Sequence, residues 1–385
     1  MAISKKRLKL CLYGNVYGAY RSQNLLKLLV DDGYRVAWVS PEFYQERGLK
    51  KSLATKVAHK LFQFYGLVDL FIKALLSDVL YVLPVNIRLV KTALRVARLC
   101  QTKLIVEIHV LLYDALVRDQ KTVAADSAEA RALKENDILA LTQSDYFINP
   151  AEYEVDYWAD LLGVKVDKQK FFASPLFSEP TTACKRDYER QGPLRICWWG
   201  TLIALHGVDT MIDAMQQLKE KSIPFTCHLF GIPPAGQGHL LEKYEALIRE
   251  QGLSDQVFIR PDLRFSDGSL PNYLIENCDL ALGIFGQSER ARAAVPTKLI
   301  DALTLGLPTL TMATPALDEF FEVSTDLWTC EPTADQLAQN ILAIDNGTLP
   351  PLDWPSTRAK VLKTFSLDRY KEVIDKILSQ ISTQF

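Results

Sequence analysis

The stretch LALGIFGQSERARAAVPTKLIDALTLGLPTLTMATPALDEF, residues 280–320, predicts the fold more strongly than any other part of the chain. Its first six residues form an apolar, strand-like run that opens into a polar loop. A helix-like run follows over 298–305, and a second apolar strand is expected over 307–312. Strand, helix and strand in this order are typical of a parallel sheet covered by helices.

The loop between that strand and that helix is rich in cations. Arg290, Arg292 and Lys298 lie within nine residues, where a strand ends and a helix starts. Cations at such a position are well placed to hold a phosphate. Asp301 follows Lys298 by three residues, so the two share one face of the helix. This pair suits a nucleotide, because the cation can take phosphate oxygens and the carboxylate can take ribose hydroxyls.

The motif resembles the donor-binding motif of GT-B glycosyltransferases, especially the retaining family 4 type. In that family a lysine precedes a glutamate by three residues, and A-x-x-x-G-x-P follows. The resemblance implies an α/β protein of two doubly wound, Rossmann-like domains that face each other across a cleft. The family also has an earlier glutamate, and its position here is Ala293. Asp301 replaces the later glutamate with a shorter side chain.

The chain length and its alternating pattern predict the domains. With 385 residues the chain is too long for one ordinary core. Strand-like and helix-like runs alternate, stop at a polar stretch and then start again. We therefore expect an N-terminal, acceptor-side domain over 1–180, a linker over 181–194 and a nucleotide-sugar-binding domain over 195–365. The amphipathic C-terminal helix, 366–385, is expected to pack back toward the first domain.

Charge is divided unevenly along the chain. Residues 1–110 hold 18 Lys and Arg against 7 Asp and Glu, a net charge of +11, so the remainder holds 26 against 39, a net charge of −13. A basic first half fits a surface that meets an anionic partner, and two separately soluble domains remain the alternative. No apolar run is long enough for a transmembrane helix, and the N-terminal apolar run is too short for a signal peptide.

Cysteine usage indicates the compartment. The seven cysteines are scattered and odd in number, and no C-x-x-C occurs, so neither a zinc site nor a disulfide framework is indicated. This pattern favours a reducing compartment. We expect a cytoplasmic protein, with peripheral binding to the inner face of the membrane left open.

A basic amphipathic segment within residues 46–76 keeps that membrane alternative open. Apolar residues recur there at i, i+4 spacing, lysines lie toward the other side and aromatic residues follow. Such a helix can lie on an anionic bilayer, so residues 46–65 are a candidate membrane contact. The alternative is an ordinary surface helix that packs on the first sheet.

The start of the second domain carries a second part of the family resemblance. Family 4 enzymes have G-R-L-x-x-x-K-G after the first strand of this domain, and Gly200 and Gly207 match its two glycines. Thr201 stands in place of the arginine and His206 in place of the lysine. The cations of the family neutralise the leaving diphosphate, whereas a histidine is only partly charged at neutral pH.

Two interpretations are open, one for the missing positive charge and one for His206. Arg290 and Arg292 could restore the positive charge from the opposite loop. His206 could instead be a turn histidine that caps the start of the following helix.

In the first domain, IVEIHVLLYDAL ends a strand with Glu107 and His109. Side chains alternate along a strand, so these two residues face the same way. Open α/β sheets bind ligands at the carboxyl ends of their strands, and the pair is therefore the catalytic candidate. His109 resembles a family histidine that lies near the transferred sugar and the acceptor. A semi-buried structural histidine is the alternative.

The first loop, GNVYGAYRSQN over 14–24, combines Gly14 and Gly18 with a helix start that carries Arg21. Glycine-rich turns allow a backbone to approach a phosphate or a sugar, so this loop is a candidate acceptor or phosphate site. A simple strand–helix turn is the alternative. The loop is not G-x-G-x-x-G and no acidic residue ends the second strand, so a dinucleotide cofactor is disfavoured.

Absent motifs narrow the function. No Asp-x-Asp, P-loop or G-x-S-x-G sequence occurs, and we expect neither a metal nor another cofactor. The basic residues do not follow a nucleic-acid-binding pattern. The resemblance therefore implies a metal-independent, retaining transfer of a sugar from a nucleotide-sugar donor to a glycan or lipid-linked acceptor, in polysaccharide or cell-envelope synthesis. A catalytically silent nucleotide-sugar-binding protein and a nucleotide-sugar 2-epimerase are the alternatives.

Overall fold

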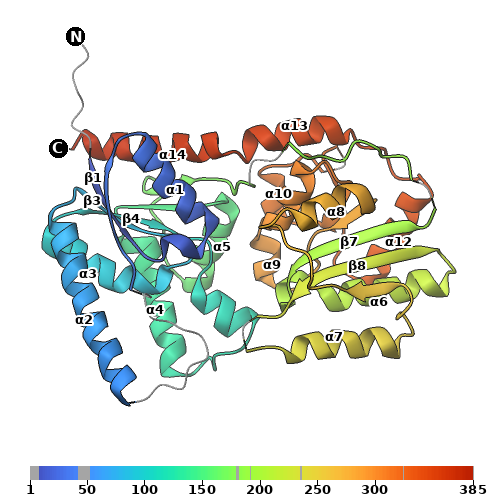
Figure 1. Cartoon of the computed structure of the whole chain (residues 1–385), viewed down its shortest axis with the longest axis horizontal. Coiled ribbons are helices and arrows are strands. Elements are labelled where there is room, and N and C mark those ends of the chain that lie inside the picture. Colours follow the sequence, from blue (N-terminus) through green and yellow to red (C-terminus); the bar gives the residue numbers. More distant parts are fainter. Residues whose placement is uncertain are drawn as a thin grey trace, which may run out of the picture. The chain divides into compact units, whose positions relative to one another are not determined.

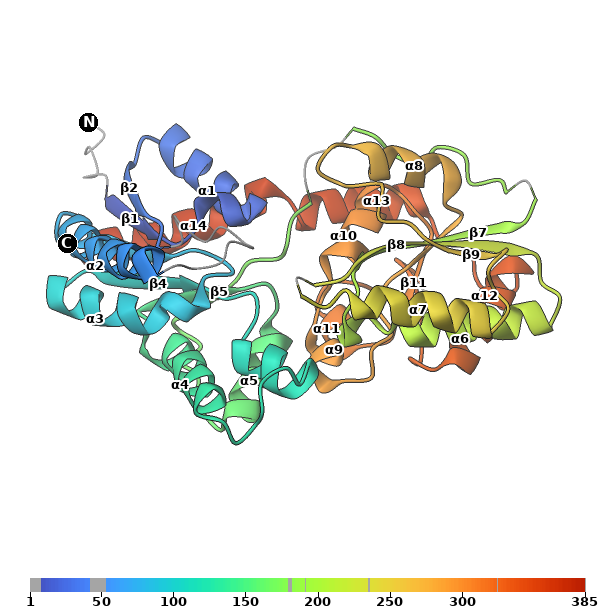
Figure 2. The same ribbon diagram turned by 60° about the horizontal axis from the view of Figure 1, so that its bottom comes forward.

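The computed structural model of the chain forms two compact units, which are described separately. Unit 1 comprises Met1–Ser174 with Leu367–Phe385, and unit 2 comprises Pro175–Ser366 (Figures 1 and 2). The structure describes residues 8–41, 53–178, 182–190, 192–234, 236–323 and 325–384, and of 53–59 it describes the backbone only.

Unit 1 contains a parallel sheet of six strands in the order β2-β1-β3-β4-β5-β6. Its central strands are apolar and buried on both faces, which explains their continuous apolar sequences. The strands are β1 Lys9–Tyr13, β2 Arg35–Val39, β3 Val79–Val82, β4 Lys103–Glu107, β5 Tyr146–Asn149 and β6 Phe171–Ala173.

Helices cover both faces of this sheet. Leu80, Val82, Leu104 and Val106 pack in one cluster with residues of α2, α3, α4 and α5. Side chains of the intervening positions, including Tyr81 and Glu107, meet α1 and α14. The helices are α1 Tyr20–Asp31, α2 Leu53–Leu75, α3 Val90–Cys100, α4 Ala128–Gln143, α5 Glu152–Leu162 and α14 Leu367–Ser382, and a π-helical segment spans Tyr113–Asp119.

Unit 2 repeats this architecture with strand order β12-β11-β10-β7-β8-β9, again all parallel. The strands are β7 Leu194–Thr201, β8 Phe225–Ile232, β9 Val257–Ile259, β10 Leu280–Leu282, β11 Thr309–Met312 and β12 Trp328–Cys330. The helices are α6 Val208–Glu220, α7 His239–Glu250, α8 Ser269–Asn277, α9 Glu289–Ala293, α10 Thr297–Thr304, α11 Pro315–Asp318, α12 Ala334–Asp345 and α13 Trp354–Thr364. The predicted class, two Rossmann-like α/β halves, is confirmed.

The unit boundaries differ in detail from the expected ones. The first stretch of unit 1 ends at Ser174 rather than at residue 180. The described residues of the expected linker belong to unit 2, where the Lys185 backbone N–H donates to the Leu305 carbonyl at 2.8 Å. The C-terminal helix α14 belongs to unit 1, and its apolar face, from Tyr370 to Ile381, is buried.

The decisive stretch also differs locally from its prediction. Arg290 and Arg292 lie on the short helix α9 instead of in a loop, because the Ser288 hydroxyl accepts from the Ala291 N–H at 3.2 Å and caps the helix start. The strand predicted over 307–312 begins only at Thr309, since Pro308 has no N–H to donate to the sheet. In the described residues, no helix combines the length and the apolar composition needed to cross a bilayer.

Gly207 fixes the loop between β7 and α6 against the loop after β10. It has φ +66°, and a Cβ built on it would lie 2.3 Å from the carbonyl carbon of Phe285. The His206 carbonyl accepts from the Phe285 N–H at 3.0 Å, so the two loops are joined at this point. Only glycine combines this backbone conformation with such a close approach.

We expect Gly207→Ala to destabilise unit 2 more than Gly347→Ala does. Gly347 has a similar φ of +64°, but a Cβ added to it would meet no atom within 4 Å, so it isolates the backbone cost of roughly 1–2 kcal/mol. Gly207→Ala should lose a further ~1–3 kcal/mol through overpacking. Urea unfolding measures both variants, and equal losses would show that the contact with Phe285 is not restrictive.

Candidate functional site

The donor-motif residues of unit 2 meet at the carboxyl end of β7. Gly200 has φ +145°, and a Cβ built on it would lie 3.0 Å from Cε and 3.1 Å from Nζ of Lys298. The same Cβ would lie 3.4 Å from a ring carbon of His206. The missing side chain of Gly200 therefore leaves the space in which the lysine and the histidine come together. Lys298 itself stands in the first turn of α10.

The amine of Lys298 is buried and has no counter-charge in direct contact among the described residues. Its side chain is only 6 % exposed, and Nζ lies 5.1 Å from the ring centroid of Trp198. Its ammonium makes no hydrogen bond or ion pair within the part of the chain that the structure describes. Burial lowers the pKa of Lys298 well below its ordinary value, and the charge of Asp301 only partly offsets that effect. An anion bound here would restore the charged form.

His206 is neutral at physiological pH. Burial, then the charges of Lys298 and Arg290, lower its pKa to about 3, although its hydrogen bond with the Thr201 carbonyl acts in the opposite direction. Because that partner is a carbonyl oxygen, Nδ1 carries the proton and donates. The other ring nitrogen, Nε2, then keeps a lone pair and is a hydrogen-bond acceptor.

This geometry supports neither of the two roles expected for His206. The residue supplies no positive charge in the place of the family lysine. It does not cap α6 either, because Gly207 is the N-cap and no side chain bonds to the helix start. The ring packs edge-on against Trp198, with centroids 5.5 Å apart. Thr201, which replaces the family arginine, is exposed and contributes its backbone carbonyl.

The two arginines of helix α9 point in different directions. Two residues apart on a helix point about 200° from each other, so Arg290 and Arg292 lie on opposite sides. Arg290 is partly buried, and its charge acts on His206. Arg292 is exposed. The expectation that both arginines serve the site therefore narrows to Arg290.

Asp301 lies one helical turn after Lys298. It is partly buried, and the Ser178 hydroxyl donates to its Oδ1 at 2.8 Å. A carboxylate has two oxygens with several acceptor positions, so it can accept more than one hydrogen bond. Ser178 precedes the polar stretch and was not expected at the site, because no local pattern marks it.

In unit 1, Glu107 is completely buried on the sheet and is surrounded by donors. Tyr81 Oη donates to it at 2.6 Å, Tyr370 Oη donates at 2.9 Å, and Arg21 forms an ion pair with it. Burial alone would raise the pKa of Glu107, but the charge of Arg21 and the hydrogen bonds from His109 and Tyr81 lower it to about 2. Glu107 is therefore an ionised residue that orients its neighbours.

His109 sits two residues beyond Glu107, just past the carboxyl end of β4. Its Nε2 lies 3.3 Å from Oε1 of Glu107, and its side chain is 17 % exposed. Burial lowers the pKa of His109, with Glu107 acting in the opposite direction. A neutral ring that donates through Nε2 to the carboxylate has Nδ1 as a free acceptor. Such a nitrogen can accept a hydrogen bond, or a proton, from a sugar hydroxyl.

The first loop is arranged differently from its prediction. Arg21 does not face a ligand from the loop but is buried, because it neutralises Glu107, donates to Ser174 Oγ at 2.8 Å and lies 4.0 Å from the Tyr370 ring centroid. Gly14 has φ +137°, and a Cβ there would lie 2.7 Å from the Asn86 side chain. Gly18 ends a 3-10 turn in the same loop.

We expect Glu107→Gln to destabilise unit 1 strongly, because it leaves the buried guanidinium of Arg21 uncompensated. Breaking one partner of a buried pair costs about 3–5 kcal/mol. The matched control is Glu135→Gln, which removes the exposed Lys91–Glu135 pair (2.7 Å) and should cost less than about 1 kcal/mol. Denaturant unfolding at pH 7 measures both.

The pH dependence checks the same pair. The pKa of Glu107 is lower in the folded protein than its ordinary value of 4.5. Its contribution to the free energy of unfolding is therefore fully present above pH 4.5 and is lost as the pH falls toward about 2. Equal destabilisation by the two variants at pH 7 would contradict the role of Glu107.

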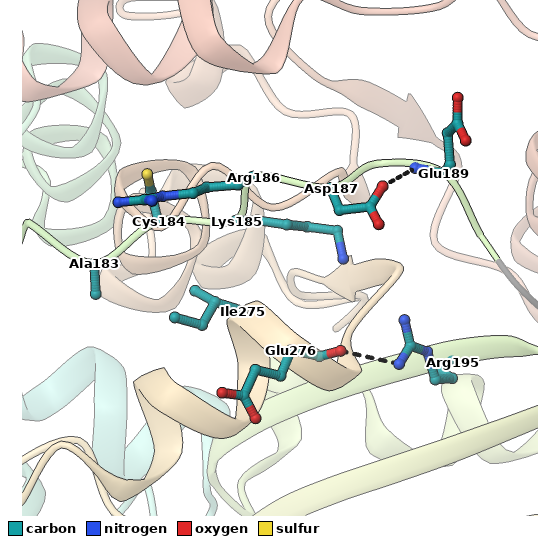
Figure 3. Close-up of a pocket in the computed structure, with 9 residues that line it drawn as sticks. All are labelled: Ala183, Cys184, Lys185, Arg186, Asp187, Glu189, Arg195, Ile275 and Glu276. Atoms are coloured by element: carbon teal, nitrogen blue, oxygen red, sulfur yellow. Dashed lines mark hydrogen bonds between the residues drawn. The ribbon is translucent and has the colours of Figure 1, made fainter.

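Unit 2 also has a crevice at the amino ends of its strands. The crevice has a volume of about 470 Å³, and its wall, drawn in Figure 3, includes Lys185, Arg195 and Glu276. Arg195 stands at the start of β7 and donates to the Glu276 carbonyl at 2.9 Å and to Asp279 at 2.7 Å. The crevice therefore lies at the amino ends of the strands, away from Lys298, and its cations Lys185 and Arg195 both pair with Asp279.

Solved structures that match nearly the whole length of the chain identify the fold. HepE of Anabaena, solved with UDP and glucose, is 12 % identical, with a TM-score of 0.67, and covers 97 % of this chain and 100 % of its own. The lipopolysaccharide outer core galactosyltransferase WaaB is 12 % identical, with a TM-score of 0.66 and the same coverage. Sucrose-phosphate synthase from Thermosynechococcus elongatus is 14 % identical, with a TM-score of 0.69, and covers 98 % and 100 %. The fold is therefore the GT-B fold.

The family comparison locates the glycosyltransferase signature. Residues 185–348 match the family model described as glycosyl transferases group 1, which covers most of unit 2 and none of unit 1. Curated proteins provide no match to the sequence. The match to glycosyl transferases group 1 therefore falls on unit 2, the unit that contains Gly200, Lys298 and Asp301.

Proposed function

We propose that this chain transfers a sugar from a nucleotide-sugar donor to a glycan or lipid-linked acceptor, with retention of configuration and without a metal ion. The observation that carries the proposal is the buried, unpaired ammonium of Lys298 beside Gly200, in the part of the chain that the structure describes. It lies within the stretch that matches the glycosyl transferases group 1 model.

A bound diphosphate would supply the counter-charge that Lys298 lacks among the described residues. An ammonium in a low-dielectric surrounding is costly without a partner, and the pKa of Lys298 falls for that reason. A donor diphosphate would supply the missing negative charge. The bound diphosphate would keep Lys298 in its charged form. That ammonium would then stabilise the charge that develops on the leaving diphosphate, and stabilising this charge is the largest electrostatic demand of this reaction type.

The remaining donor contacts follow from position. Asp301, one turn from Lys298, would accept the ribose hydroxyls through its carboxylate oxygens. Arg290 would add the second positive charge, while neutral His206 would accept a hydrogen bond through Nε2. Gly200, Thr201 and Gly207 would contribute backbone and space. HepE, one of the similar structures, is described with UDP, which makes UDP the first probe.

His109 is the proposed contact to the transferred sugar or to the acceptor, and Glu107 is its positioning residue. The carboxylate fixes the ring through Nε2 and leaves Nδ1 available. Because Glu107 is fully buried, it would not touch substrate itself. A lipid-linked acceptor would agree with a peripheral position at a membrane. Of the contact expected through residues 46–65, positions 46–52 lie outside the described residues, and of 53–59 only the backbone is described.

A second candidate function is nucleotide-sugar binding without turnover. The neutral state of His206 and the buried Ala293 in place of the earlier family glutamate favour it. Donor binding without consumption of donor in the presence of acceptors would support this candidate over the first.

Lys298→Met should weaken UDP binding, because it keeps much of the side-chain volume and removes the charge. The expected loss is roughly 1.5–3 kcal/mol, the scale of a charge-assisted hydrogen bond. Arg290→Ala should also weaken binding. Arg292→Ala is the matched control and should leave the dissociation constant unchanged, since that side chain is exposed on the far side of α9. Isothermal calorimetry with UDP decides, and an unaltered Lys298→Met variant would refute the phosphate role.

His109→Ala should lower turnover by about 10²-fold, the scale for a positioned acid, base or polar contact. Binding of UDP should change little, because the nucleotide is assigned to unit 2. The readout is release of UDP from a UDP-sugar, together with calorimetry on the same variant. Normal turnover in His109→Ala would return this residue to the role of a structural histidine.

A further inference from the structure

Helix α2 carries an apolar stripe that faces outward. Nine of the eighteen large apolar side chains that are exposed in the described part of the chain lie between residues 61 and 76. Eight of them follow the i, i+3, i+4 pattern of one helical face and are 39–67 % exposed. Seven of these lie on α2, and Leu76 directly follows its last residue. We call these eight the outer stripe: Leu61, Phe64, Tyr65, Val68, Phe71, Ile72, Leu75 and Leu76. At 100° per residue they span about 140° of the helix.

The inner side of the same helix is narrow. Leu70 and Ala74, one turn apart, are fully buried in the cluster that joins α2 to the first sheet. Lys73 holds the end of the helix by donating to the Trp38 carbonyl at 3.0 Å. The sheet contact therefore uses these few positions, and the richer apolar face is left outward. Figure 1 shows α2 at the outer side of unit 1, beside α3.

Cations stand at both ends of the outer stripe. Lys60 precedes it and is exposed. At its other end, Lys9, Arg35 and Lys73 line a crevice of about 180 Å³ that also includes Leu76. Lys73 is paired with Asp69 at 2.7 Å, but the side chains of Lys9 and Arg35 form no ion pair within the described residues.

Charge identifies the kind of partner. We propose that the outer stripe of α2 docks on an anionic lipid bilayer, with the helix lying in the plane of the interface. The apolar and aromatic side chains would enter the boundary between headgroups and acyl chains, and the flanking cations would contact lipid phosphates. A stripe of sixteen residues measures about 24 Å along the helix, so it would lie along the surface.

A second copy of the chain fits this surface less well. Pairing two outer stripes in either direction would bring a cationic end of one helix beside a cationic end of the other, because both ends carry positive charge. An anionic surface instead gains from both ends at once. Membrane docking is separate from sugar transfer, and binding to vesicles requires neither donor nor acceptor, so the two proposals can fail separately.

The test is co-sedimentation of the full chain with vesicles of phosphatidylcholine alone or with about one third phosphatidylglycerol. We expect binding to the anionic vesicles, little binding to the neutral ones, and a several-fold loss in 0.5 M salt, because screening weakens contacts between exposed charges. The triple variant Leu61→Gln, Phe64→Gln, Ile72→Gln should reduce binding at least tenfold. Its side chains are exposed, so its unfolding midpoint and UDP affinity should be retained.

The matched control removes as many exposed apolar side chains from other elements. Val30→Gln, Ile232→Gln, Leu362→Gln should leave vesicle binding unchanged. Lys9→Gln, Arg35→Gln should weaken binding to anionic vesicles at low salt. Absence of binding by the unaltered chain, equal binding to neutral vesicles, or equal loss in the control would overturn the proposal. So would a dimer in solution that the stripe variant converts to a monomer without any vesicle binding.

Discussion

Burying an ionised group is costly unless a partner neutralises it, and this constraint governs both units. In unit 1 the buried carboxylate of Glu107 gathers Arg21, Tyr81 and Tyr370, which come from α1, β3 and α14. The C-terminal helix is thereby fixed to the first sheet by a contact across 263 positions of sequence. Packing of the apolar face of α14 adds to this, but the buried charge determines which side chains must meet.

The buried ionisable group of unit 2, Lys298, has no such set of partners among the described residues. Lys298 is surrounded by Trp198, Gly200 and neutral His206, and Asp301 acts on it only at a distance. Protein groups that fully paired this lysine would occupy the position of a ligand anion. In the proposed function, the paired carboxylate of Glu107 would position His109, whereas the side chain of Lys298, which no described residue pairs, would bind the donor. The difference lies in how many partners the fold supplies, since both charges stand at carboxyl ends of parallel strands.

The sequence predicts what is local. Buried parallel strands are continuous apolar runs, so β7, β8 and β10 could be located, and the spacing of Lys298 and Asp301 survives because one helix carries both. Contacts between distant residues leave no local signal. Arg21 was expected at the loop surface but pairs with Glu107, 86 positions away. The neutral state of His206 depends on burial beside Lys298, which spacing alone does not reveal.

Helix α2 shows a further limit of pattern reading. Its sequence is apolar on nearly every side between residues 61 and 76, and such a pattern is typical of a buried helix. The structure buries only the side of Leu70 and Ala74, which packs in the cluster with the first sheet. Periodicity identifies a face but not what covers it. The exposed apolar side chains of the outer stripe do not by themselves identify a partner. The cations at the two ends of the stripe do, because they favour an anionic lipid surface.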